Sequence, residues 1–267
     1  MISRRSKGLS IGVNINPDMS CTFGCIYCQI DRTCGRELGE VHLAILHDEL
    51  HMAIEEARNG RLWNEPRFLG TPADLRRIND IAFSGDGEPT CTKEFDRAVE
   101  TAAKARKDCR CDDVKLVVIT NATRLASPQF QRALPILDEN NGEIWAKLDA
   151  GTEEFFQQVN RPVGNITLDN IVADITHIAR LRPVVIQTLM FRIDGAGPPP
   201  GEVEAYCRRL RDILDAGGEI SLVQLHTIAR KPPSDSVTAL PDEHLNALEA
   251  TIRKNVRGAN VETFYGA

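Results

Sequence analysis

The sequence predicts an α/β protein built as an incomplete (β/α)6 barrel of the TIM type, and three observations lead there. Short apolar segments alternate with segments of helical spacing along most of the chain, which is the pattern of parallel βαβ units. No G-x-G-x-x-G follows the first expected strand, so a dinucleotide-binding fold is disfavoured. Polar residues gather where strands end, which is where a parallel barrel assembles its site.

The expected strands are short and apolar, and most end at a turn or a polar residue. The first is indicated by the alternation of Ile11, Val13 and Ile15 before Pro17. The full set is residues 10–16, 78–83, 114–119, 143–148, 184–191 and 219–225, with 261–264 as a candidate last strand.

The expected helices lie between these strands. In the first of them, Leu50, Ile54 and Ala57 recur at helical spacing, and Asn59-Gly60 ends the run. The full set is residues 48–58, 92–107, 127–137, 152–158, 168–181, 202–216 and 241–255. Residues 61–77 contain two prolines and are expected to cover one edge as a long loop.

The length predicts one domain over residues 1–267. The expected elements place its core at about 9–228 and a C-terminal helix and strand at about 241–265. A hydrophobic fraction of 42% and a charged fraction of 26% are ordinary for a globular protein. The net charge of −6 argues mildly against a broad nucleic-acid interface, with a local exception at Arg4, Arg5 and Lys7. No apolar run approaches the ~20 residues that span a bilayer. The start of the chain has no apolar signal segment, and the cysteine usage fits a reducing, cytoplasmic location.

Three thiols lie within eight residues, because Cys21, Cys25 and Cys28 form a C-x3-C-x2-C pattern. Thiolates are soft ligands, and three of them in one loop suit an iron–sulfur cluster or zinc. Zinc sites usually have a second ligand pair, which is missing here, although Cys34 is a candidate fourth ligand. Three cysteines on a [4Fe–4S] cluster leave one iron open to a substrate or cofactor.

A glycine-rich element, Gly85-Asp86-Gly87-Glu88-Pro89-Thr90, follows the second expected strand. Its residues are also those of an ordinary turn, and the proline after Glu88 favours a non-helical backbone. Glycines allow a close approach of the backbone to a ligand. Glu88 is the candidate source of a compensating negative charge.

Five further polar residues are candidates, four of them at later strand ends, and each has a structural alternative. Asn121 is either a ligand-binding residue or a helix cap. Lys147 and Asp149 share one face of their strand, so they are expected to bind a ligand or to form a structural ion pair. Arg161 either clamps a carboxylate or lies on the surface, and His226 either contacts a ligand or is a structural histidine.

The cysteine pattern, with the aromatic Tyr27 before its last cysteine, closely resembles the signature of the radical S-adenosylmethionine (SAM) superfamily. Further segments resemble the subgroup that includes the tRNA wybutosine synthases. These segments are residues 12–14, 25–29, 83–90, 147–152, 160–162 and 223–226. The matches spread from about residue 12 to 226, so they imply a partial barrel of the radical SAM type over most of the chain.

The resemblance implies one [4Fe–4S] cluster on Cys21, Cys25 and Cys28, which cleaves SAM to methionine and a 5′-deoxyadenosyl radical that abstracts a substrate hydrogen. It assigns adenine contact to Tyr27 and contact with the methionine amino group to the Gly85–Glu88 element. Asn121, Lys147, Asp149, Arg161 and His226 are the remaining expected SAM contacts. An external electron donor of the flavodoxin or ferredoxin type is implied. The substrate stays open among small molecules, peptides and nucleic acids.

Alternatives remain for the function. Wybutosine-type tRNA modification is weakened because residues 1–20 contain no cysteine for a second cluster. The other alternative functions are a glycyl-radical enzyme activase and a non-catalytic iron–sulfur or zinc protein. A second cluster drawn from the remaining cysteines is disfavoured, since only Cys109 and Cys111 are close in sequence; the others are Cys34, Cys91 and Cys207.

Overall fold

The computed structural model describes residues 1–31 and 39–266. These residues form two compact units, each built from several stretches of the chain. The first comprises Met1–Ser20, Gly35–Ile119 and Ala126–Glu143, and the second comprises Cys21–Cys34, Thr120–Leu125 and Ile144–Ala267. Among the described residues, no helix is long and apolar enough to cross a membrane.

The sheet of the first unit has the strand order β1-β2-β3-β4. Strands β2, β3 and β4 run parallel, whereas the short β1 pairs antiparallel with β2. Parallel strands need a crossover connection, and helical segments supply it between β2 and β3 and between β3 and β4. The strands are β1 (Ile2–Ser3), β2 (Gly8–Val13), β3 (Ile78–Phe83) and β4 (Lys115–Thr120).

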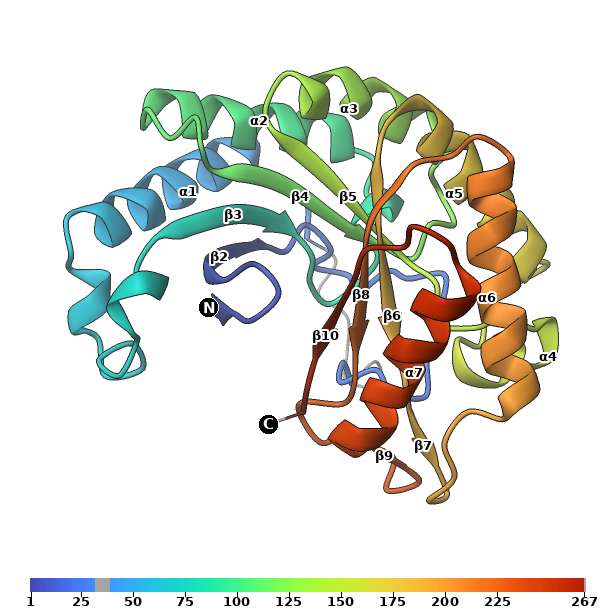
Figure 1. Ribbon diagram of the computed structural model, residues 1–267. Helices are drawn as coiled ribbons and strands as arrows, with labels where there is room; N and C mark the ends of the chain where they lie inside the picture. The colour runs from blue at the N-terminus through green and yellow to red at the C-terminus, as the bar shows by residue number, and fades with distance from the viewer. Residues whose placement is uncertain (32–38, 267) are drawn as a thin grey trace. The chain divides into compact units, whose positions relative to one another are not determined.

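Three helices lie on one side of these strands (Figure 1). Ser127 caps the last of them by accepting a hydrogen bond from the backbone N–H of Phe130. Phe83, Phe95 and Phe130 form an aromatic chain with ring centroids 6.0 and 5.9 Å apart. The helices are α1 (Leu43–Arg58), α2 (Phe95–Asp108) and α3 (Pro128–Asp138).

The segment 61–77 covers the edge near β2, as the sequence predicts. It contains two single turns of 3₁₀-helix, η1 (Leu62–Asn64) and η2 (Ala73–Leu75). Trp63 donates its indole N–H to the carbonyl of Ala57, at 2.9 Å. Its ring packs with Phe68 in a buried cluster that includes Leu9 of β2.

The sheet of the second unit has the order β5-β6-β8-β10, with all strands parallel. Every residue of β6 is buried, as expected for a central parallel strand. The strands are β5 (Gly142–Lys147), whose first two residues belong to the first unit, β6 (Val184–Leu189), β8 (Ile220–His226) and β10 (Val261–Phe264). The helices are α4 (Glu153–Val159), α5 (Leu168–Leu181), α6 (Pro200–Asp215) and α7 (Asp242–Asn255).

Two expected strands are shorter than the sequence predicts. The strand expected over 10–16 ends at Val13, because the side chain of Asn14 accepts a hydrogen bond from the backbone N–H of Asn16. The strand expected over 184–191 ends at Leu189. Its continuation, β7 (Phe191–Ile193), instead pairs antiparallel with β9 (Val237–Ala239) in a separate two-stranded ribbon.

Candidate functional site

The cysteine loop, residues 21–28, is an irregular segment of the second unit. Phe23 is its anchor: the ring is buried and meets the ring of Phe156 edge-on, with centroids 5.4 Å apart. A tight turn follows, in which the backbone N–H of Cys28 donates to the carbonyl of Cys25 at 3.0 Å. The turn brings the second and third cysteines of the pattern close together along the backbone.

The segment that follows α4 braces this loop through the backbone. The N–H of Gly24 donates to the carbonyls of Asn160 and Arg161, at 3.1 and 3.0 Å. The N–H of Val163 donates in return to the carbonyl of Thr22, at 2.8 Å. Arg161 has a φ of +47°, a conformation that a residue with a side chain adopts only when its surroundings fix it. Its side chain is exposed, so the contribution of Arg161 that the structure shows is made by its backbone.

A buried carboxylate lies beside the loop. Oδ2 of Asp149 accepts hydrogen bonds from the hydroxyl of Tyr27 and, at 3.1 Å, from Nδ2 of Asn160. Nζ of Lys147 lies 3.6 Å from the same oxygen and 5.2 Å from the centroid of the Tyr27 ring. Lys147 and Asp149 therefore face the same side of the strand end, and the Lys147 ammonium balances the buried charge.

The surroundings of Cys25 and Tyr27 favour their protonated forms. Burial raises the pKa of Cys25 to about 11, with Tyr27 and Asn160 as opposing hydrogen-bond partners. Burial, followed by the charge of Asp149, holds the pKa of Tyr27 well above its usual value. A metal has to displace the proton of Cys25, because thiolates rather than thiols are metal ligands.

Asn121 stands directly after β4 and reaches the other end of the loop. Its Nδ2 donates to Oγ1 of Thr22 at 2.9 Å and lies 3.7 Å from Sγ of Cys21. Its Oδ1 accepts from the backbone N–H and the hydroxyl of Thr123, at 3.2 and 2.8 Å. The Thr22 and Thr123 hydroxyls are themselves 2.7 Å apart, so this end of the loop is fixed by a small polar network.

His226, at the end of β8, is half-buried in the second unit. Its Nδ1 lies 3.4 Å from the carbonyl of Gln224. This polar partner of the His226 ring therefore comes from the same strand, β8.

The glycine-rich element belongs to the first unit and packs tightly there. A Cβ on Gly85 would come within 2.5 Å of Asn14 Oδ1, and a Cβ on Gly87 within 2.3 Å of the Ser20 carbonyl oxygen. A larger residue at either position would therefore force its neighbour to move. The carboxylate of Asp86 accepts a hydrogen bond from Nδ2 of Asn14, at 2.9 Å.

Glu88 is buried, with 3% of its surface exposed. Its Oε1 accepts from the backbone N–H and hydroxyl of Thr90, at 3.2 and 2.6 Å, and so caps the single turn η3 (Pro89–Cys91). Its backbone N–H donates to the carbonyl of Ser20, the residue before Cys21 in the sequence, at 2.8 Å. The element is thereby tied to the residue that leads into the cysteine loop.

The donor set of the loop fits an iron–sulfur cluster. Cys21, Cys25 and Cys28 form no disulfide, and amide N–H groups approach the first two sulfurs. Across residues 1–31 and 39–266, however, no three His, Cys, Asp or Glu side chains lie close enough together to hold a metal ion. The loop thus brings the three thiols into one segment without bringing them to a common point. Cys34, the fourth ligand in the zinc alternative, lies outside the described residues.

The other described cysteines also form no disulfide, and they lie on other elements. Cys91 ends η3, Cys109 and Cys111 are buried after α2, and Cys207 is buried on α6. Burial raises the pKa of Cys109, Cys111 and Cys207. These surroundings are those of structural cysteines.

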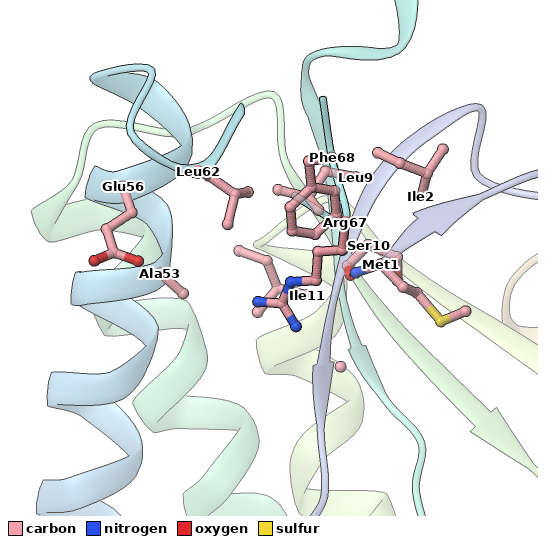
Figure 2. Close-up of a pocket in the computed structure, with 11 residues that line it drawn as sticks. Met1, Ile2, Leu9, Ser10, Ile11, Ala53, Glu56, Leu62, Arg67 and Phe68 are labelled. Atoms are coloured by element: carbon pink, nitrogen blue, oxygen red, sulfur yellow. The ribbon is translucent and has the colours of Figure 1, made fainter. Parts of the chain in front are cut away.

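A cavity of about 470 Å³ opens in the first unit, between α1 and β2 (Figure 2). Leu9, Leu62 and Phe68 line it with apolar surface, and Glu56 and Arg67 are its charged side chains. No residue of the cysteine loop or of the glycine-rich element is among its lining residues. The cavity therefore shares no lining residue with either segment.

Sequence reasoning missed Asn160 as a functional side chain, although it singled out the neighbouring Arg161. It also missed Thr22 and Thr123. The one available signal for Asn160 was its position just after α4, in the Asn-Arg-Pro segment. Nothing in that segment indicates contact with Cys25, which lies 135 residues earlier.

The curated relatives of this chain are distant, and no protein-family model matches it. The chain is 26% identical over 171 residues to UPF0026 protein MJ1312 of Methanocaldococcus jannaschii, covering 64% of this chain and 46% of that protein. It is 28% identical over 169 residues to UPF0026 protein slr1464 of Synechocystis sp., covering 63% and 54%. It is 24% identical over 259 residues to GTPase Obg of Brachyspira hyodysenteriae, covering 96% and 33%. The chain spans about half or less of the length of these relatives.

Solved structures resemble the chain over nearly its whole length. A radical SAM methyltransferase from Sphaerobacter thermophilus has a TM-score of 0.63 at 17% identity, covering 99% of this chain and 68% of that one. Streptococcus suis SuiB bound to S-adenosylmethionine has a TM-score of 0.57 at 12% identity, covering 97% and 48%. The protein anSMEcpe with bound AdoMet has a TM-score of 0.57 at 12% identity, covering 96% and 64%.

The first of these neighbours is described as a radical SAM methyltransferase, and the other two are described with bound S-adenosylmethionine. At such low identity the likeness shows the fold alone. The prediction of the fold class is confirmed: the chain has the α/β fold of a partial (β/α)6 TIM-type barrel of the radical SAM type.

Proposed function

We propose that this chain is a radical SAM enzyme in which Cys21, Cys25 and Cys28 hold one [4Fe–4S] cluster and leave one iron open to SAM. The observation that carries the proposal is a loop of three cysteines outside any disulfide, with amide donors at two of the sulfurs, in a chain with the fold of radical SAM enzymes. When bound, such a cluster supplies one electron to SAM, which splits into methionine and a 5′-deoxyadenosyl radical that abstracts a substrate hydrogen.

The residues of the chain have separate tasks in this proposal. Tyr27, held by Asp149, presents its ring toward the adenine of SAM. The Gly85–Glu88 element contacts the methionine amino group, with Glu88 as the source of a compensating negative charge. Lys147 supplies a cation for the methionine carboxylate or the ribose. Arg161 and His226 are the other proposed SAM contacts, whereas Asn121 is engaged with the cysteine loop itself.

An external one-electron donor of the flavodoxin or ferredoxin type belongs to the proposal. The substrate is a small molecule, a peptide or a nucleic acid, and membership in the wybutosine-synthase subgroup stays a prediction. The GTPase activity named for the Brachyspira relative is not transferred, since this sequence contains no G-x4-G-K-[S/T] phosphate-binding segment.

The test is anaerobic reconstitution with iron and sulfide, followed by an assay for 5′-deoxyadenosine with SAM and a low-potential reductant. We expect about four irons per chain and slow formation of 5′-deoxyadenosine that is lost in Cys25→Ala. Cys207→Ala, which removes a buried thiol of α6, is the matched control and should keep the activity. A chain that takes up no iron, or that forms 5′-deoxyadenosine equally well in Cys25→Ala, would contradict the proposal.

A further inference from the structure

Two buried asparagine amides approach two of the three thiol sulfurs. Nδ2 of Asn121 lies 3.7 Å from Sγ of Cys21, and Nδ2 of Asn160 lies 3.7 Å from Sγ of Cys25. The two asparagines are 5% and 2% exposed. They come from different elements, the end of β4 and the end of α4, so neither contact follows from local sequence.

The orientation of the Asn121 amide is fixed at both ends. Its Oδ1 accepts hydrogen bonds from the N–H and hydroxyl of Thr123, and its Nδ2 donates to the hydroxyl of Thr22. Reversing the amide would turn Nδ2 toward the Thr123 N–H and so set two donors against each other. The nitrogen is therefore the atom that faces Cys21.

The orientation of the Asn160 amide is fixed by charge. Nδ2 lies 3.1 Å from the buried carboxylate of Asp149 and 3.2 Å from the hydroxyl oxygen of Tyr27. Reversing the amide would place its carbonyl oxygen against that carboxylate. Oδ1 of Asn160 is buried and has no hydrogen-bond partner among the described residues, which is unfavourable. The Asn160 side chain thus keeps its Nδ2 contacts with Cys25, Tyr27 and Asp149 although its Oδ1 makes no hydrogen bond among the described residues.

We propose that Asn121 and Asn160 are positioning residues of the cluster site, which donate N–H···S hydrogen bonds to Cys21 and Cys25 and thereby raise the reduction potential of the cluster. The inference rests on the proposed function. Hydrogen bonds to ligating sulfurs stabilise the added negative charge of the reduced state, so they move the potential upward. The Lys147 ammonium near Asp149 keeps the surroundings of Asn160 from adding a net negative charge.

The test measures the potential of the loaded protein without SAM, by redox titration followed with electron paramagnetic resonance. The variants are Asn121→Leu, Asn160→Leu and the double variant, with the exposed Asn246→Leu of α7 as the control. At a fixed solution potential, we expect the ratio of reduced to oxidised cluster to fall about tenfold in each single variant, which is about 59 mV for a one-electron couple. The fall should be larger in the double variant and absent in the control.

A second readout separates hydrogen bonding from mere packing. The iron–thiolate stretching bands in resonance Raman spectra should shift when wild-type protein is exchanged into D2O, and this shift should shrink in the variants. If the leucine variants do not fold, Asn121→Ser and Asn160→Ser replace them, because a serine hydroxyl is too short to reach the sulfur.

The outcomes distinguish the two proposals. A wild-type chain that takes up no iron contradicts the proposed function. A chain that loads normally, with unchanged potentials and an unchanged D2O shift in the variants, overturns this inference and leaves the proposed function standing.

Discussion

Oδ1 of Asp149 accepts a hydrogen bond of 2.8 Å from the backbone N–H of Leu189, which ties the second residue after β5 to the last residue of β6. The other oxygen of the same carboxylate serves Tyr27, Asn160 and Lys147. One buried carboxylate thus connects two parallel strands to the cysteine loop. Asp149, which the sequence predicts as a ligand contact, therefore also holds together several elements of the second unit.

Replacing Asp149 with alanine should lower the free energy of unfolding by about 3 kcal/mol, because it leaves a largely buried ammonium and several donors without their acceptor. Equilibrium unfolding in urea measures the change. The exposed Asp215→Ala is the matched control and should stay within about 0.5 kcal/mol of wild type. Equal stability of Asp149→Ala and Asp215→Ala would show that this carboxylate does not hold the strand ends.

Gly87 should not tolerate a side chain, whereas Gly12 should. A Cβ at Gly87 would come within 2.3 Å of a backbone oxygen, that of Ser20, whereas a Cβ at Gly12 meets no atom within 4 Å. We expect Gly87→Ala to lower the free energy of unfolding by about 1–3 kcal/mol, as overpacking does. Gly12→Ala should leave it unchanged or slightly raise it. Urea unfolding of both variants measures the contrast, and a Gly87→Ala protein as stable as Gly12→Ala would contradict the packing argument.

Much of the fold could be predicted from the sequence because local patterns determine it. Apolar periodicity places β3, α5 and β10 at their observed bounds, and Thr167 with Asn170 forms a capping box at the start of α5. The ribbon of β7 and β9 escaped prediction because each strand has three residues, too few for a periodic signal.

The candidate site could be predicted only in part. Cysteine spacing and strand ends carry a local signal, so they point to Cys21, Cys25, Cys28 and Asp149. The contacts of Asn121 with Cys21 and of Asn160 with Cys25 join residues 100 and 135 positions apart. Such contacts depend on how the elements pack, and a single sequence contains no pattern for them.

The effect of pH on stability should differ between the wild type and Asp80→Asn. Asp80 is 2% exposed, and its burial raises the pKa of the carboxyl, while a 2.5 Å hydrogen bond from the Ser10 hydroxyl opposes the rise. The folded state therefore holds the proton more tightly than the unfolded state does. The stability that this proton contributes is present below the unfolded-state pKa of about 3.9, and it is lost as the pH rises through the folded-state value.

The Asp80→Asn substitution keeps an acceptor for the Ser10 hydroxyl, but the amide carries no charge at any pH. We therefore expect the free energy of unfolding of Asp80→Asn, relative to wild type, to increase from pH 4 to pH 7. Urea unfolding across this range measures the difference. The exposed Asp74→Asn controls for the change in net charge. A difference between Asp80→Asn and wild type that stays constant with pH would contradict the assigned effect of burial.

The hydroxyl of Tyr206 should stabilise the second unit more than that of Tyr265. Tyr206 on α6 is fully buried, and its hydroxyl lies 2.6 Å from that of Thr188 in β6, which is also fully buried. Tyr206→Phe leaves the Thr188 hydroxyl without this partner, so we expect a loss of about 1–2 kcal/mol in the free energy of unfolding. Tyr265 is 39% exposed, and water can replace its 2.7 Å hydrogen bond to Asn246, so Tyr265→Phe should change the stability by less than about 0.5 kcal/mol. Thermal and urea unfolding of the two variants measure the contrast. An equal loss of unfolding free energy in Tyr206→Phe and Tyr265→Phe would show that the buried hydrogen bond adds no stability beyond that of the exposed one.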